Sequence, residues 1–369
     1  MTPPPAPSLA EALERAKAVA DEVLFPRAQE TDRAPTIPAE NLRALRDAGL
    51  LGLHGSVDVP GGIGADHAAA RPVLEAVAGG CGATSFVWAQ HHGAVRRVRS
   101  GDGPACATWL PRLCDGSTLA GIGFAYLRRP GPPAVRAERT ANGWRIDGAA
   151  PWITGWGLID VLIVMARSAD GSVVTAAVDR PGERRELRAG DPQALAVMGA
   201  TRTVSLAFDG LEIGDDDVVG VLDHDVWDRR DRLGSSMPAP APLGITDRAI
   251  RLLAERAPAP FVGDAASSLS AMLAERRRVA DEVARSLMAS ASAEDAGFDR
   301  AISGGARERD RGLDLARRAT DALVAASGGG AISLSHPAQR LSREATFFLI
   351  QAQTGDLRRA TLHRIVADR

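Results

Sequence analysis

The sequence predicts a mostly helical α+β protein made of three consecutive parts: helices, then strands, then helices. Apolar residues recur at helical spacing in the first part. Short β-branched runs separated by turn dipeptides replace that spacing in the middle, and helical spacing then returns. We therefore expect a helical domain over residues 1–118, a β domain over 119–225 and a helical domain over 226–369. Because strands and helices do not alternate, a Rossmann sheet is excluded.

The composition is that of an ordinary globular protein. The 369 residues are 45% hydrophobic and 24% charged, with a formal net charge of −2, which gives no electrostatic case for binding nucleic acid or an anionic membrane. No run reaches the ~20 apolar residues of a membrane helix, and the N-terminus does not have the pattern of a signal peptide. Cys81, Cys106 and Cys114 fit neither a zinc site nor a redox pair, so we expect free thiols and a cytoplasmic location.

The first part is expected to begin with two helices. Residues 1–8 predict a disordered lead-in, and the apolar spacing of Leu9–Val23 predicts a helix that Pro26 ends. Pro38 suits the first turn of a second helix, which we expect to stop at Gly49.

A glycine-rich loop and a longer helical region follow. The loop Val59–Gly64 lacks the lysine and the preceding strand of a phosphate-binding loop, so we expect it to be structural. Residues 69–100 predict helices that carry His91 and His92 side by side. Adjacent helical side chains point in different directions, so no shared metal site is predicted. We expect one ring to be buried with a partner and the other to be solvated.

The stretch Pro151–Gly157 is the most distinctive feature of the middle part. It follows one strand-like run and precedes another, Leu158–Met165. We expect a strand end at the lip of the sheet, where two glycines let the backbone turn sharply. The hydroxyl of Thr154 would then lie between Trp152 and Trp156.

The C-terminal part predicts long helical segments. Their apolar positions recur at helical spacing, and no internal repeat is present. The segments are Leu243–Ala254, Ser268–Ser290, Leu313–Ala326 and Arg340–Val366.

Several motifs in this order resemble those of the acyl-CoA dehydrogenases. Trp152-Ile153-Thr154, with the strand before it, is similar to the segment that marks the middle β domain of that family. The other matching segments are Leu42–Gly52 with Pro60-Gly61-Gly62, Val204–Ile213, Leu243-Gly244 with Ala249, Ala326–Gly329, and His336–Ala345. The resemblance covers nearly the whole chain. It implies a middle β-barrel domain and a C-terminal four-helix bundle.

The resemblance also implies FAD, bound between the β domain and the bundle, and a homotetramer or at least a dimer, because a neighbouring subunit completes the FAD site. In the family, the threonine hydrogen-bonds the region of flavin N5, the tryptophan packs on the isoalloxazine, and the glycine pair and an arginine approach the FAD of a partner chain. The cofactor-binding residues implied here are Trp152, Ile153, Thr154, Gly328, Gly329 and Arg256.

The largest departure from the family concerns the catalytic base. Most members remove a proton from an acyl thioester with a glutamate, and that position is Ala352 in this chain. The region where other members place the base holds no carboxylate, and Asp231 is the nearest. The candidate catalytic residues are therefore Asp231, His91 and His92.

The binding segments depart as well. The substrate loop becomes Arg128–Ala134, and the arginine segment that contacts the FAD pyrophosphate becomes Arg256–Phe261 with altered spacing. FMN or a loosely held reduced flavin is therefore an alternative to FAD. Trp156 stands where the family has a small or amide residue, which predicts a narrowed space beside the flavin. The expected pocket residues are Trp156, Arg128, Gln351 and Ala352.

Three functions follow from this pattern. The first is a flavin-dependent oxidoreductase of acyl-CoA dehydrogenase type, acting on an acyl thioester or a related carbonyl compound. The second is a monooxygenase on the same scaffold that uses reduced flavin and O₂, with His91 or His92 hydrogen-bonding the oxygenated flavin. The third is a catalytically inactive flavin-binding or partner subunit. An electron-transfer partner or a flavin reductase is expected for the active forms.

Overall fold

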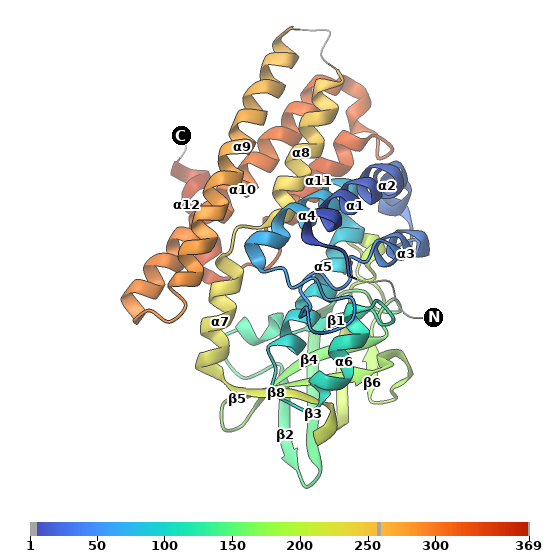
Figure 1. Cartoon of the computed structure of the whole chain (residues 1–369), viewed down its shortest axis with the longest axis vertical. Coiled ribbons are helices and arrows are strands. Elements are labelled where there is room, and N and C mark those ends of the chain that lie inside the picture. The colour runs from blue at the N-terminus through green and yellow to red at the C-terminus, as the bar shows by residue number, and fades with distance from the viewer. Residues whose placement is uncertain (1–5, 257–259, 368–369) are drawn as a thin grey trace.

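The structure is a computed structural model that describes residues 6–256 and 260–367. It has the predicted order of helices, strands and helices, and it confirms the mostly helical α+β class (Figure 1). The predicted disorder over residues 1–8 lies largely outside the described residues. The domain boundaries after residues 118 and 225 stay predictions.

The N-terminal helices open with continuous helical backbone from Leu9 to Arg33. Pro26 does not end it: this prediction is wrong, because the wider π-helical turn just before Pro26 lets the helix continue through a residue that lacks an N–H. A π-helical turn, Val19–Leu24, joins α1 to α2. The helices are α1 Leu9–Ala18, α2 Phe25–Arg33, α3 Ala39–Asp47, α4 His67–Gly80, α5 Gly82–Arg99 and α6 Ala105–Cys114.

Pro38 lies one position before the first turn in which it was predicted, and Gly49 confirms its predicted role. Pro38 precedes α3, and Gly49 has a φ of 72° just after that helix ends. In the loop Val59–Gly64, a β-carbon on Gly62 would lie 1.8 Å from Ser56 O. That contact is possible only for glycine, so the glycines of this loop serve close backbone packing.

The middle part forms one eight-stranded sheet. The strand order is β6-β7-β3-β2-β4-β5-β8, and β1 pairs with β4. Within the described strands the pairing path ends at β6 and β8, so hydrogen bonds do not close the implied barrel. The strands are β1 Ala120–Gly123, β2 Val135–Thr140, β3 Gly143–Ile153, β4 Val161–Ser168, β5 Ser172–Asp179, β6 Leu187–Ala189, β7 Val204–Gly214 and β8 Val218–Asp223.

The C-terminal part is a bundle in which α10 contacts α8, α9, α11 and α12. The predicted segment Arg340–Val366 is wrong as a single helix, because a non-helical connection separates α11 from α12. The helices are α7 His224–Ser236, α8 Pro240–Ala254, α9 Pro260–Ala289, α10 Asp295–Ser327, α11 Pro337–Phe347 and α12 Gly355–Ala367. The bundle joins the N-terminal part through α4 and α8. A β-carbon on Gly244 would lie 2.1 Å from Glu75 O, so these helices cross in backbone contact.

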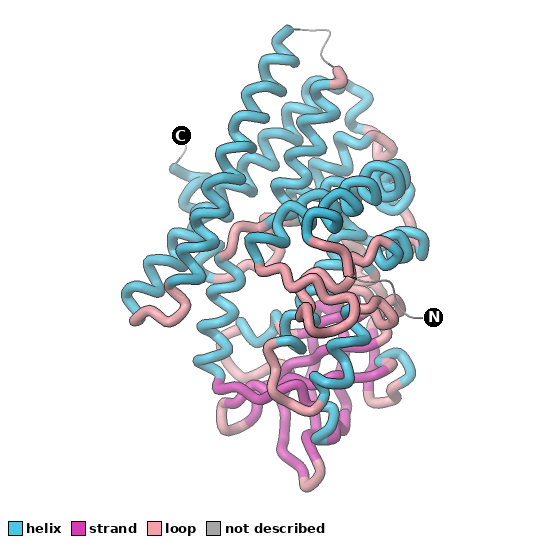
Figure 2. Tube along the Cα trace, in the orientation of Figure 1, coloured by secondary structure: helices cyan, strands magenta, loops and turns pink. Residues whose placement is uncertain are grey.

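The sheet lies at one end of the molecule and the bundle at the other (Figures 1 and 2). Helix α5 links the two hydrophobic cores. Its first half, with Val87 and Trp88, belongs to the helical core, and its second half, with Val95 and Val98, belongs to the core of the sheet. Among the described helices, none has the length and apolar character needed to cross a bilayer.

Candidate active site

A cavity of about 440 Å³ lies beside α5. Its wall combines α4, α5, the segment after β1, α7, the start of α8, α10 and the connection between α11 and α12. The fold thus brings together side chains that are more than 250 positions apart in the sequence. Five predicted site residues line this wall: His92, Arg128, Asp231, Gln351 and Ala352.

Asp231 is not a free base. Arg128 donates from Nε and Nη2 to the two carboxylate oxygens of Asp231, at 2.7 and 2.8 Å. The two side chains are 16% and 8% exposed, so water does not compete strongly for these bonds. A carboxylate held at both oxygens by one guanidinium is poorly placed to take a proton. Asp231 therefore holds the segment after β1 against α7, and its proposed role as base is corrected.

The two adjacent histidines are both buried, so the expectation of one solvated ring is wrong. His91 has partners on both nitrogens: Nδ1 accepts from Ala120 N–H at 3.1 Å, and Nε2 donates to Leu51 O at 3.1 Å. Burial lowers the pKa of His91 to about 4, so the ring is neutral. His91 does not line the cavity, and its contacts are those of a structural residue, which corrects its proposed catalytic role.

His92 has the opposite environment. It is 1% exposed, lines the cavity, and has no hydrogen-bond partner on Nδ1 or Nε2 within the described residues. Its ring meets the edges of Trp88 and His54, with centroids 4.4 and 5.3 Å apart. Burial lowers the pKa of His92 well below its usual value. The neutral ring thus has one donor and one acceptor that no described residue uses, although both nitrogens are buried.

Ala352, at the position of the family's glutamate, has an unusual backbone. Its φ is 54°, in the left-handed region, and the residue lies on the cavity wall. The preceding residue is fixed by Arg309, whose Nη2 donates to Gln351 O at 3.3 Å and to Gln351 Oε1 at 3.1 Å. The connection that carries Gln351 and Ala352 is therefore held against α10.

The backbone of Ala352 supports a stability prediction. Ala352→Gly is expected to raise the free energy of unfolding by about 0.5–1 kcal/mol, because a left-handed residue with a β-carbon costs roughly 1–2 kcal/mol and the flexibility of glycine offsets only part of that. Urea denaturation followed by circular dichroism measures the change. Ala271→Gly, on the exposed face of α9, is the control and should lower stability by about 1 kcal/mol. Equal losses for both variants would contradict the prediction.

Thr154 lies at the end of a chain of three hydroxyl groups. Thr201 Oγ1 donates to Met198 O at 2.7 Å, so its single hydrogen is used. Thr203 Oγ1, 3.0 Å away, must therefore donate to Thr201. Thr154 Oγ1 is 3.1 Å from Thr203 Oγ1 and must in turn donate to Thr203. The chain leaves the oxygen of Thr154 as a hydrogen-bond acceptor.

Comparison with known proteins indicates the family. Residues 7–117 match the family model described as "Acyl-CoA dehydrogenase, N-terminal domain". The chain is 26% identical to a Mycobacterium tuberculosis protein named probable acyl-CoA dehydrogenase FadE25, over 94% of this chain and 92% of that protein. The match of residues 7–117 and the similarity over nearly the whole chain support membership of the acyl-CoA dehydrogenase superfamily. The chain is also 28% identical, over 42% of its length and 41% of the relative, to 3-sulfinopropanoyl-CoA desulfinase of Paraburkholderia xenovorans.

Solved structures of other proteins share the fold. Dibenzothiophene monooxygenase TdsC from Paenibacillus sp. A11-2 superposes with a TM-score of 0.79 at 20% identity, covering 98% of each chain. Butyryl-CoA dehydrogenase from Megasphaera elsdenii superposes with a TM-score of 0.75 at 18% identity, covering 97% of this chain and 98% of that one. At these identities the similarity establishes the fold alone.

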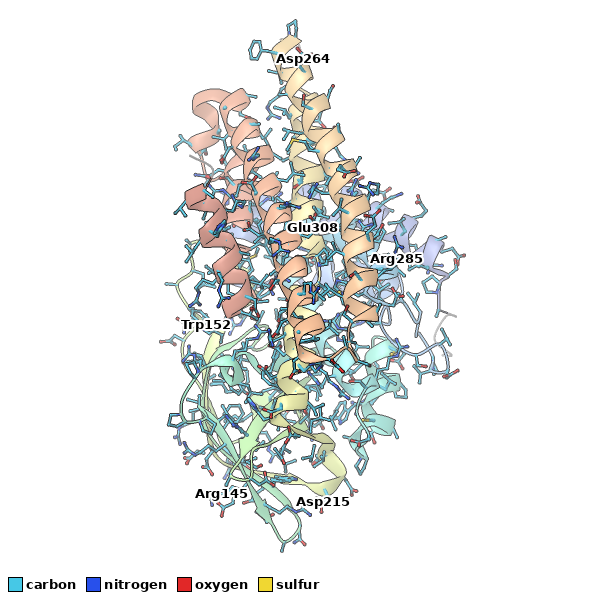
Figure 3. All side chains as sticks on the ribbon, turned by 90° about the vertical axis from the view of Figure 1, so that its left-hand side faces the viewer. Arg145, Trp152, Asp215, Asp264, Arg285 and Glu308 are labelled. Atoms are coloured by element: carbon cyan, nitrogen blue, oxygen red, sulfur yellow. The ribbon has the colours of Figure 1, made fainter. Side chains whose placement is uncertain are left out.

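The residues implied by superfamily membership fit a flavin ring in part. Trp152 is 50% exposed, at the end of the β module that faces the helices (Figure 3), and its open face can pack on a flat ring. Thr154 offers an acceptor two residues later. Ile153 is fully buried in the sheet core, so its side chain packs against protein. Trp156 packs against the same core and does not line the cavity, which corrects the expectation that it narrows the pocket.

The remaining implied residues do not reach the cavity. Gly328 and Gly329 are exposed, and a β-carbon on either would meet nothing within 4 Å. Arg256 lies near the same segment, with Nη2 3.4 Å from His336 Nε2. Nothing in one chain requires glycine at Gly329, and the left-handed φ of Gly328, 62°, marks the end of α10. Their proposed contact is with the flavin of a second subunit.

Sequence reasoning missed the arginines of the wall. Arg96, Arg97, Arg230 and Arg309 line the cavity together with Arg128. The 44 basic residues are spread among 46 acidic ones, so no cluster stands out in the sequence. The available signal was the spacing of Arg96 four positions after His92, which places both on one face of α5. The described part of the chain contains no group of three or more His, Cys, Asp or Glu residues suited to a metal ion.

Buried histidines make the stability of the protein sensitive to acid. Burial lowers the pKa of His54 to about 3 and the pKa values of His67 and His91 to about 4. The unfolded chain binds these protons near pH 6.5 and the folded protein does not, so stability is present above that pH and is lost as the pH falls. We expect a loss of about 3–4 kcal/mol between pH 6 and 5. Urea titrations at pH 7.5, 6 and 5 measure it, and a flat profile would contradict it.

Proposed function

We propose that this protein is a flavin-dependent monooxygenase, which uses reduced flavin and O₂ to hydroxylate a small molecule in the cavity. The observation that carries the proposal is that the described wall offers no free carboxylate. Ala352 stands at the position of the family's base, and Asp231 is engaged by Arg128. Dehydrogenation of an acyl thioester requires a group that removes a carbon-bound proton, whereas hydroxylation by reduced flavin does not.

A bound flavin would supply electron transfer and the reaction with oxygen. The residues of this chain would hold and orient it. Thr154, kept as an acceptor by Thr203, suits the reduced flavin, because N5 carries a hydrogen only in that state. Trp152 would pack on the ring, and the neutral side chain of His92 would hydrogen-bond a polar group in the cavity.

FAD is the cofactor we propose, with FMN as the alternative. A glutaryl-CoA dehydrogenase from Mycobacterium smegmatis was solved with FADH2, and TdsC was solved with FMN. Both proteins share the fold of this chain, so either FAD or FMN is a reasonable cofactor for it. Titration of the purified protein with each flavin, followed by the visible spectrum, distinguishes them.

Rapid mixing of the reduced, flavin-loaded protein with oxygen tests the proposal. We expect a transient absorbance distinct from those of reduced and oxidised flavin, followed by a hydroxylated product when a substrate is present. Direct reoxidation without a transient, across a panel of substrates, would count against a monooxygenase. Protein that binds neither flavin would point instead to the inactive subunit.

Dehydrogenation of an acyl thioester is the second candidate, and one observation favours it. His92 is a neutral ring on the cavity wall whose buried nitrogens have no hydrogen-bond partner among the described residues, so a substrate that reached them could give it a proton. Anaerobic addition of acyl-CoA compounds to the oxidised, flavin-loaded protein would then bleach the flavin. Bleaching would support this function over the monooxygenase, and its absence over a broad panel would argue against it.

The hydroxyl chain behind Thr154 predicts a shift in flavin potential. Thr203→Val removes the acceptor of the Thr154 hydrogen, so Thr154 becomes free to donate to oxidised N5. The midpoint potential should fall by about 20–40 mV, which corresponds to roughly one hydrogen bond for a two-electron couple. Equilibration with a reference dye measures it. Thr175→Val, buried within β5, is the matched control. An unchanged potential in the Thr203 variant would contradict the prediction.

We also infer a homo-oligomer, and an electron-transfer or flavin reductase partner. Gly328 and Gly329 are open in one chain, and Ile332 and Leu334 nearby are 80% and 56% exposed. An apolar surface beside glycines suits contact with a second subunit. Light scattering coupled to size-exclusion chromatography tests the oligomer, and a monomer at working concentration would contradict it. A cytoplasmic location stays a prediction.

A further inference from the structure

We propose that the cavity binds a small organic anion through Arg96 and Arg309, so that the substrate is a carboxylic acid and not a neutral compound. The inference rests on the proposed function only in treating the ligand as a substrate. The binding site itself depends on the charges of the residues in the wall, on their hydrogen-bond partners and on the shape of the cavity.

The wall carries a strong excess of positive charge. Five arginines line it, Arg96, Arg97, Arg128, Arg230 and Arg309, against one carboxylate, that of Asp231. The whole chain has a formal net charge of −2, so the excess is local. A concave site lined by one sign of charge attracts ligands of the opposite sign.

Arg309 is buried without a carboxylate partner. It is 7% exposed, and the groups that it contacts are neutral oxygens. Its Nη1 donates to Ser235 O at 3.1 Å and to Met237 O at 3.5 Å, and its Nη2 donates to the backbone and side-chain oxygens of Gln351. Burial lowers the pKa of Arg309 to about 10, so it stays charged at neutral pH while water solvates it poorly.

Arg96 has no hydrogen bond or ion pair with any described residue. Its side chain is exposed because it opens onto the cavity, although protein surrounds it on most sides. Burial lowers its pKa to about 10 as well, and Arg97 contributes. Arg96 lies one helical turn from His92. Both Arg96 and Arg309 lower the pKa of His67, which indicates that the two cations face the same part of the cavity.

Other arginines of low exposure in this chain behave differently. Four of them are bound to a carboxylate: Arg71 to Glu75, Arg276 to Glu308, Arg340 to Glu344 and Arg343 to Asp32. Burial of a charge is unfavourable unless an opposite charge compensates it. Arg309 lacks that compensation within the protein, and a ligand anion would supply it. Arg96, which opens onto the same cavity, would face that anion.

The rest of the wall defines the body of the ligand. Phe86, Phe124 and Phe348 line the cavity, with Ile122 and Met237. A volume of about 440 Å³ suits a small molecule. Guanidinium groups match the planar, two-oxygen geometry of a carboxylate. A compact aromatic carboxylic acid satisfies both the apolar and the cationic surfaces.

Isothermal titration of the full chain with benzoate and with its neutral counterpart benzamide tests the inference. We expect benzoate to bind at least tenfold more tightly than benzamide. Arg96→Gln should weaken benzoate binding at least tenfold and leave the affinity for benzamide unchanged. The variant should fold normally, because Arg96 has no partner among the described residues. Arg129→Gln, exposed and outside the wall, removes the same charge and should change neither affinity.

Equal affinities for the two probes, or unchanged benzoate binding by Arg96→Gln, would overturn the inference. The phosphate of a flavin is the other source of an anion. If Arg96→Gln weakened FMN but not riboflavin, and benzoate competed with FMN, the arginines would serve the cofactor and the substrate class would be wrong. The titrations are run with and without FAD, so a protein that failed to act as a monooxygenase would still give a clear answer.

Discussion

His92→Leu is expected to lower turnover at least a hundredfold while leaving the free energy of unfolding unchanged or raising it by about 1–2 kcal/mol. The two nitrogens of His92 have no partner among the described residues, although the ring is 1% exposed. A buried polar atom without a hydrogen bond is unfavourable, so an apolar side chain of similar size relieves that cost. The protein then loses the unused donor and acceptor of a residue that lies on the cavity wall.

The adjacent residue provides a matched control. His91→Leu removes the partners of Leu51 O and Ala120 N, which stay buried, so stability should fall by about 2–4 kcal/mol. Urea denaturation of both variants, with flavin binding and turnover measured in parallel, separates the two residues. If His92→Leu were destabilised as much as His91→Leu, His92 would have a structural role like that of His91 and the functional assignment would fail.

Arg340→Met is expected to lower the free energy of unfolding by about 3–5 kcal/mol. Arg340 and Glu344 are 1% and 2% exposed, with Arg340 Nη1 2.7 Å from Glu344 Oε1. Arg340 Nε also donates to Gln29 Oε1 at 2.6 Å, and Gly82 N–H donates to Glu344 Oε1 at 3.2 Å. Loss of the arginine leaves the carboxylate buried and unpaired in the contact between α11, α2 and α5.

Two further variants check this reason. Arg278→Met removes an arginine whose carboxylate partners are exposed on α9, and its midpoint temperature should barely change. The double variant Arg340→Met with Glu344→Leu removes both buried charges and should recover much of the lost stability. A single Arg340 variant as stable as the parent, or a double variant no better than the single, would contradict the assignment.

Elements with a strong local pattern were predictable from the sequence. The apolar run from Val161 to Met165 lies in β4, where each of those residues is fully buried, as a central strand requires. The predictions that were wrong concern elements whose conformation depends on contacts between segments that are distant in the sequence. The break after Phe347 has no glycine or proline before Gly355, and Arg309 on α10 fixes its conformation through Gln351.

Site residues could be predicted only where the side chain of a single residue indicates the chemistry. Ala352, Asp231 and His92 were all named from the sequence, and all three line the same cavity. Whether a carboxylate is free depends on a partner such as Arg128, which is 103 positions away from Asp231. Whether an adjacent pair of histidines is buried depends on what covers α5, and the helical core covers its first half while the core of the sheet covers its second half.

The cavity also bears on the cooperativity of unfolding. Its wall draws on the N-terminal helices, the strand segment and the C-terminal bundle, so a ligand there touches all three consecutive parts of the chain at once. Such a ligand stabilises only the state in which the three parts are assembled. At a hundred times its dissociation constant it adds about 2.7 kcal/mol to that state. Occupied protein should therefore unfold in one step under conditions in which the empty protein separates into stages.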